Sequence, residues 1–264
     1  MGSAAFRAWV LPPEDLGTAG AQRRRKMAKD RCGQIGKTVF IITYGRSGST
    51  LLQNMLNALP GYALRGENAN LLAPLVRAWH GLRHSEQAAS MRARGTPSGP
   101  HQPWYGYEAI DADRFGRDLA ESFLRQVLRP GPDTRVTGFK EIRWHEDPAL
   151  FPPMLEFLAK YMPRAHFIFN TRDHEEVRNS GWWRGMKRAA VLEQLQTAEA
   201  LYSRWQAAHP GRCLAMHYND YARDPAAWRA LFAFLGEPFD LDLVEAVLER
   251  KLLHMKWQKP VGKP

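Results

Sequence analysis

The chain has 264 residues, 44% of them hydrophobic, with 37 lysines and arginines against 27 aspartates and glutamates and a formal net charge of +10 at pH 7. This length suffices for one sizeable α/β domain, and the two cysteines, Cys32 and Cys213, are too few for a disulfide framework. No apolar run approaches the roughly 20 residues of a membrane helix, and the N-terminus lacks a secretory signal, so a soluble cytoplasmic protein is expected.

The excess of basic residues suits an anionic ligand or an acidic partner. Nucleic acid is one alternative, but the sequence has no zinc-finger spacing, no prominent helix-turn-helix and no basic segment interleaved with aromatics. A nucleic-acid-binding function would therefore rest on charge alone, and we expect no nucleic-acid partner.

Residues 1–36 are expected to form an N-terminal leader with little packing of its own, which includes the basic run Arg23-Arg24-Arg25-Lys26. Such a run is more often a solvated tail than a binding site. The folded domain is expected to span residues 37–264.

The segment 37–53 carries the first functional signal. Residues 39–43 are apolar and suit a buried parallel strand, while Gly45 and Gly48 allow a tight turn and close approach of a ligand. Unpaired N–H groups and the dipole at the following helix start attract an anion. The candidate anion-binding residues are Arg46, Ser47, Gly48, Ser49 and Thr50.

The helix that starts at this loop continues with leucine and methionine at helical spacing and stops at Pro60-Gly61. Glu67 follows on the returning turn, and residues 68–83 are predicted to be helical. Residues 92–107 are rich in glycine, proline and aromatic side chains and are predicted to form a long loop.

The remaining predicted elements alternate between helix and strand. They are a helix at 114–128, a strand at 135–139, a helix at 151–162, a strand at 166–171, helices at 174–181 and 187–207, a strand at 214–218 and a helix at 225–235. This order predicts an α/β fold, a single domain with a central parallel β-sheet flanked by helices. Ligands bind such sheets at the carboxyl ends of the strands.

A second anion site is predicted where the strand at 166–171 ends. Arg172 stands at this turn, and Ser180 follows eight positions later, about two helical turns along. Arg172 alone would be interpreted as a surface arginine, but here it follows an earlier phosphate-binding loop in the same chain.

The run Tyr44-Gly-Arg-Ser-Gly-Ser-Thr-Leu-Leu52 lacks the Gly-Lys-Ser/Thr of nucleoside triphosphatases, which disfavours the alternative of a phosphate-loop nucleotide kinase. The run resembles the 5′-phosphosulfate loop of sulfotransferases that use 3′-phosphoadenosine 5′-phosphosulfate (PAPS), and Arg172 with Ser180 resembles their 3′-phosphate element. The resemblance covers roughly residues 37–260. It implies a P-loop-like sulfotransferase architecture, PAPS as donor, 3′-phosphoadenosine 5′-phosphate (PAP) as product, no metal, and Tyr218 near the adenosine.

Sulfuryl transfer requires cations for the leaving-group charge and a base for the acceptor proton. Arg46 and Lys140 are the candidate cations, and Lys140 lies directly after the predicted strand at 135–139. The alternative role of Lys140 is a salt bridge to Glu141 or a neighbour. Glu67 is the candidate base, and helix N-terminal capping is its alternative role.

The Gly-Glu context of Glu67 resembles the tyrosylprotein and carbohydrate branches of the family, whereas the small-molecule branch uses a histidine. The candidate histidines are His80, His84, His101 and His145. We also note the C-terminal lysines Lys256, Lys259 and Lys263 as weaker 3′-phosphate candidates.

The acceptor is expected to be a carbohydrate or another hydroxylated metabolite, with peptidyl tyrosine as the alternative. Aromatic residues at 101–107 and the pair Trp182-Trp183 could stack against a sugar or an aromatic acceptor, although aromatics more often serve packing. A homodimer remains open.

Overall fold

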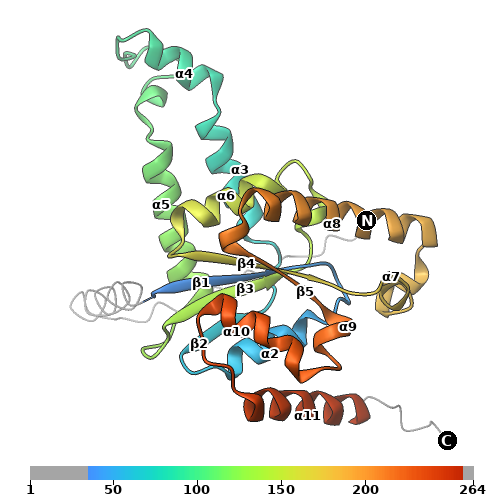
Figure 1. Ribbon diagram of the computed structural model, residues 1–264. Helices are drawn as coiled ribbons and strands as arrows, with labels where there is room; N and C mark the ends of the chain where they lie inside the picture. Colours follow the sequence, from blue (N-terminus) through green and yellow to red (C-terminus); the bar gives the residue numbers. More distant parts are fainter. Residues whose placement is uncertain (1–34, 258–264) are drawn as a thin grey trace, which may run out of the picture.

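The computed structural model describes residues 35–257, with side chains to residue 250. A five-stranded sheet in the order β2-β3-β1-β4-β5 lies at its centre, and every neighbouring pair is parallel (Figure 1). The strands are β1 (Lys37–Ile42), β2 (Tyr62–Arg65), β3 (Val136–Glu141), β4 (Ala165–Thr171) and β5 (Cys213–His217). The predicted α/β fold with a central parallel sheet is confirmed.

Helices cover both faces of this sheet (Figure 1). The α-helices are α2 (Ser49–Ala58), α3 (Leu72–Arg83), α4 (Glu86–Ala93), α5 (Ala112–Phe123), α6 (Phe151–Tyr161), α7 (His174–Arg178), α8 (Arg188–Ala208), α9 (Tyr218–Tyr221), α10 (Arg229–Leu235) and α11 (Leu241–Trp257). Among these described helices, none combines the length and the apolar character that crossing a bilayer requires.

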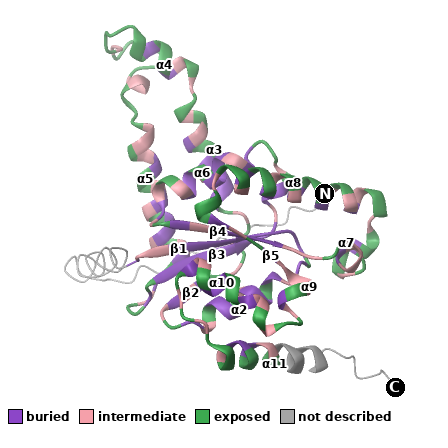
Figure 2. Cartoon of the chain, viewed as in Figure 1, coloured by how far each residue is buried: buried purple, intermediate pink, exposed green. Residues whose placement is uncertain are grey.

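The two faces of the sheet bury two separate cores, because side chains alternate along each strand. In β1, Phe40 and Ile42 join the core under α3, α5, α6 and α8, while Val39 and Ile41 join the core under α2, α10 and α11. Buried residues accordingly concentrate along the strands and the inner sides of the helices (Figure 2).

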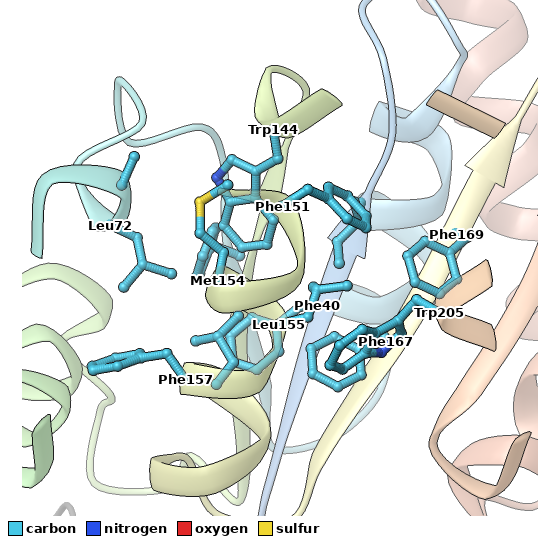
Figure 3. Close-up of a cluster of buried hydrophobic side chains, with 14 of the residues drawn as sticks. Phe40, Leu72, Trp144, Phe151, Met154, Leu155, Phe157, Phe167, Phe169 and Trp205 are labelled. Atoms are coloured by element: carbon cyan, nitrogen blue, oxygen red, sulfur yellow. The ribbon is translucent and has the colours of Figure 1, made fainter. Parts of the chain in front are cut away.

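Aromatic rings fill much of the first core (Figure 3). The rings of Phe40 and Phe167, on neighbouring strands, lie 5.8 Å apart, and Trp205 of α8 meets Phe167 edge-on at 6.1 Å. Leu155 and Phe157 of α6 are fully buried in the same cluster. Such packing fixes the strands, and therefore the loops at their carboxyl ends.

The structure differs from the predicted elements in five places. One is the helix predicted at 174–181, which ends at Arg178 and leaves Ser180 in an extended conformation beyond it. Strand β2 and helix α11 were not predicted, and α4 extends into the predicted loop at 92–107. Figure 1 shows α4 at the end of an arm, formed with α3 and α5, that projects away from the sheet. Lys140 lies within β3 rather than after it, because that strand continues to Glu141. The leader predicted at 1–36 falls outside the described residues except for its last two.

Candidate functional site

The predicted phosphate loop joins β1 to α2. Arg46 and Gly48 both have left-handed backbone conformations, with φ angles of 66° and 79°. Helix α2 starts directly after Gly48, and no side chain caps its first turn in the described structure. The Leu51 N–H donates to the Gly48 carbonyl at 2.9 Å, which leaves the N–H groups of Ser49 and Thr50 for an anion.

Aromatic rings lie directly against both glycines of the loop. A Cβ atom placed on Gly45 would come within 2.2 Å of the Trp182 ring, and one placed on Gly48 within 2.0 Å of the Tyr218 ring. The loop therefore requires glycine at both positions, and at Gly48 the left-handed backbone adds to this requirement.

Buried hydrogen bonds attach the loop to β4. The Thr43 hydroxyl lies 2.6 Å from the Asn170 carbonyl oxygen and 2.7 Å from the Ser47 hydroxyl, and the Asn170 amide donates to the Ser47 carbonyl at 3.1 Å. Ser47 is fully buried and does not line the cleft described below. Its hydroxyl, predicted as an anion donor, faces this internal network instead.

Tyr44 connects the loop to the second predicted anion element. Its phenol oxygen accepts a hydrogen bond from the Arg172 N–H at 2.9 Å and lies 2.8 Å from a carboxylate oxygen of Glu199. Burial raises the pKa of Tyr44 far above its usual value, so the phenol stays protonated and donates to the carboxylate. The two anion elements are thereby held at a fixed separation.

One cleft of about 810 Å³ brings the predicted site residues together. Of the residues predicted for cofactor binding and catalysis, the cleft is lined by Arg46, Gly48, Ser49, Thr50, Glu67, Lys140, Arg172, Ser180 and Tyr218. Helix α11 adds Val247 and Arg250 to its wall, a contribution that the sequence analysis missed. Basic side chains thus outnumber acidic ones around the cleft, which favours an anionic ligand.

The Arg172 guanidinium occupies the centre of the second anion element. It stacks on the Tyr218 ring at 4.6 Å and donates two hydrogen bonds to Glu176, at 2.6 and 2.9 Å. These bonds lower the pKa of Glu176 below its usual value. A third guanidinium nitrogen donates to the Arg46 carbonyl at 3.1 Å, and the Arg46 side chain donates to the Ser180 hydroxyl at 3.0 Å.

Glu67 and Lys140, predicted as base and cation, form an ion pair with 2.8 Å between Lys140 Nζ and Glu67 Oε1. The Arg143 guanidinium lies 3.7 Å from the other Glu67 oxygen. Lys140 therefore pairs with Glu67 and not with Glu141, whose carboxylate accepts the Ile142 N–H at 2.8 Å. Burial raises the pKa of Glu141.

The alternative histidine bases lie elsewhere. His80, His84 and His101 do not line the cleft, whereas His145 lines a second cavity of about 420 Å³ that shares part of its wall. Burial lowers the pKa of His145 to about 4. Of the predicted bases, Glu67 is thus the one that reaches the cleft.

The cleft offers donors from the N-terminus of α2 and from Arg46, Lys140, Arg172 and Ser180. The Arg46 side chain links the two predicted anion elements, because it donates to the Ser180 hydroxyl at 3.0 Å. The Tyr218 ring lies against Gly48 of the loop and under the Arg172 guanidinium, so it contacts both predicted elements. Within the described residues, no cluster of three His, Cys, Asp or Glu side chains could hold a metal ion.

Two aromatic residues of the predicted loop at 92–107 lie away from the cleft, and the C-terminal lysines are not described. Trp104 and Tyr105 are exposed and line neither cavity. Lys259 and Lys263 lie outside the described residues, and Lys256 falls in the part of α11 whose side chains are not described.

The chain matches the model of one protein family and is similar to solved structures. Residues 38–241 match the model of a protein family described as the sulfotransferase family. The sulfotransferase domain of the Synechococcus PCC 7002 olefin synthase has a similar fold, with a TM-score of 0.51 and 22% identity over 79% of this chain and 76% of that chain. The sulfotransferase STF9 from Mycobacterium avium gives a TM-score of 0.44 and 13% identity over 90% of this chain and 78% of that one. No curated protein matches the chain in sequence.

Proposed function

This chain belongs to the sulfotransferase family, and we propose that it transfers a sulfuryl group from PAPS to a hydroxyl group of an acceptor molecule. The observation that carries the proposal is the single cleft in which the β1–α2 loop, the Arg172 element and the Glu67–Lys140 pair meet. The family match supports the type of reaction, and the residues of this cleft support the donor.

In the proposed complex, the 5′-phosphosulfate lies at the N-terminus of α2, where the N–H groups of the first turn, Ser49 and Thr50 offer donors. Arg172 and Ser180 bind the 3′-phosphate. Because Tyr218 packs against both Gly48 and Arg172, its ring is positioned to contact the adenosine between the two anionic groups.

The reaction itself is a displacement at sulfur. The acceptor hydroxyl oxygen forms a bond to sulfur while the bond from sulfur to the 5′-phosphate oxygen breaks, and the bonding electrons leave with that oxygen, giving PAP. Glu67 takes the hydroxyl proton, and Lys140 and Arg46 stabilise the charge that develops on the leaving phosphate. Lys140 is only 8% exposed, which strengthens its interaction with that charge relative to water.

The 2.8 Å ion pair between Glu67 and Lys140 places the proposed base beside the cation proposed for the leaving group. An acceptor hydroxyl entering next to Glu67 would therefore lie close to the cation that faces the leaving group. This proximity supports a direct transfer without a covalent enzyme intermediate.

We propose a carbohydrate or another hydroxylated metabolite as the acceptor, and peptidyl tyrosine is the second candidate. The donor assignment can be tested with sulfur-labelled PAPS and a mixture of sugars and hydroxylated metabolites, without magnesium. The proposal predicts label transfer and PAP release, and Glu67→Gln should abolish most of both. Phosphoryl transfer from ATP with magnesium, in the absence of any PAPS consumption, would instead indicate a phosphate-loop kinase.

A further inference from the structure

A second cavity of about 420 Å³ adjoins the cofactor cleft and shares Gly45, Ile142 and Trp182 with it. It lies between the 3-10 turn Trp144–Glu146, the 3-10 turn Gly181–Gly185 and the start of α8. Its volume lies within the range of small-molecule sites. The shared residues make this cavity a direct neighbour of the phosphosulfate loop.

The wall of the second cavity contains a histidine without internal partners. His145 is only 5% exposed, and neither of its ring nitrogens has a hydrogen-bond partner in the described structure. Buried polar groups of folded proteins are nearly always paired. A ligand hydroxyl in the cavity would supply the missing partner, and Arg143, Glu146 and Gln194 line the same cavity with further polar groups.

Trp182 adds a flat apolar surface to these polar groups. Its side chain is 56% exposed, yet its ring is held against Gly45 and stacks on Trp183 at 6.1 Å. Trp183 is itself fixed by a 2.9 Å hydrogen bond from its indole to the Gly45 carbonyl. Trp182 therefore presents a positioned aromatic face at the boundary between the two cavities.

Arg143 connects the second cavity to the reacting groups. It lines the cavity, and its guanidinium lies 3.7 Å from Glu67, which lines the cofactor cleft. Arg143 therefore belongs both to the wall of the second cavity and to the surroundings of the proposed base.

Building on the sulfotransferase activity proposed above, we propose that this second cavity is the acceptor site and that it binds a single sugar ring. The ring lies on Trp182, its hydroxyl groups bond to His145 and Gln194, and one hydroxyl points past Ile142 toward Glu67. A tyrosine side chain carries one hydroxyl and would leave most of the polar wall unpaired, so a ring with several hydroxyl groups fits this wall better.

Two glutamines of α8 provide a matched pair of variants. Gln194 lines the second cavity, whereas Gln196 is exposed and lines neither cavity. Gln194→Trp fills the proposed site, and Gln196→Trp makes the same change on the same helix outside it. Each variant would be titrated with PAP and then examined by saturation-transfer NMR, in the presence of PAP, with methyl β-glucopyranoside, methyl β-galactopyranoside and N-acetyltyrosinamide as separate probes.

We expect at least one glycoside to bind the wild type and Gln196→Trp, with binding at least tenfold weaker in Gln194→Trp and PAP affinity unchanged in all three proteins. Equal glycoside binding by the two variants would overturn the location, and binding of N-acetyltyrosinamide alone would overturn the sugar. No glycoside binding to a PAP-saturated wild type would overturn the acceptor site while leaving the donor assignment standing. Failure of the wild type to bind PAP would overturn the proposed function as well.

Discussion

Replacing Arg172 by alanine should remove the 3′-phosphate contact while leaving the fold intact. A hydrogen bond from a guanidinium to a charged group contributes about 1.5–3 kcal/mol, which corresponds to a roughly 10- to 100-fold weaker Kd for PAP. AMP lacks the 3′-phosphate, so its affinity should change little. In the free protein, the variant loses the Arg172–Glu176 pair, an i,i+4 contact of the kind that stabilises proteins by about 0.5 kcal/mol or less.

Arg178→Ala is the matched control for this experiment. Arg178 is the last residue of α7, the helix that begins two positions after Arg172, and it pairs with Glu175 at 2.8 Å without lining the cleft. Calorimetric titration of both variants with PAP and AMP, together with thermal unfolding, separates binding from stability. A parallel loss of PAP and AMP affinity in Arg172→Ala, or an equal loss of PAP affinity in Arg178→Ala, would refute the assignment of Arg172 to the 3′-phosphate.

Glu67→Gln should keep PAP affinity and lower kcat by roughly 10²-fold or more, because the amide cannot accept the acceptor proton; a near-normal kcat would show that Glu67 is not the base. Lys140→Ala should also lower kcat, through loss of charge stabilisation of the leaving group, and a rise in acceptor KM alone would make it a substrate contact instead. Burial lowers the pKa of His145 from 6.5 to about 4, so the unfolded chain binds a proton at a higher pH than the folded protein does. The full folding stability is therefore present above pH 6.5, and part of it is lost as the pH falls toward 4. Protonation of His145 alone should lower the free energy of unfolding by about 2 kcal/mol between pH 6.5 and 5. Denaturant unfolding at pH 6.5 and 5 should show a smaller loss of unfolding free energy in His145→Gln than in the wild type. An equal loss in the two proteins would contradict the role of burial.

The phosphate loop could be predicted from sequence because its signals are local. An apolar β-branched strand, two glycines and a hydroxyl-rich helix start occupy consecutive positions from Val39 to Thr50, and the structure has β1, the turn and α2 in that order. The parallel sheet followed from the alternation of strands and helices, which needs no knowledge of tertiary contacts.

The Glu67–Lys140 pair could not be predicted, because it depends on the position of β2. This strand has only four residues, and a run of that length does not stand out beside Pro60-Gly61. In the structure, Arg65 is in register with Phe139, so the chain that leaves β2 passes Lys140 of the neighbouring strand. Both side chains were expected in one site, but with β2 unpredicted their direct ion pair was not.

Helix α11 and the contact of Trp182 with Gly45 were missed for a similar reason, although Trp182 itself was a candidate for stacking on an acceptor. The packing of α11 on α2, which brings Val247 and Arg250 to the cleft, is a contact between distant parts of the chain. The contact of Trp182 with Gly45 joins residues more than a hundred positions apart. The opposite error concerns Ser47, which lies in the predicted phosphate loop. Its hydroxyl was expected to face an anion but bonds to Thr43 in a buried network.

Binding of a 3′-phosphorylated adenosine nucleotide in the cleft is what the proposed sulfuryl donor requires. Calorimetric titration of the wild-type protein with PAP, ADP and AMP, without magnesium, measures it. We expect tight binding of PAP and much weaker binding of ADP and AMP, since only PAP presents the phosphate that Arg172 and Ser180 would bind. Binding of ADP as tight as that of PAP, or tighter, would contradict it.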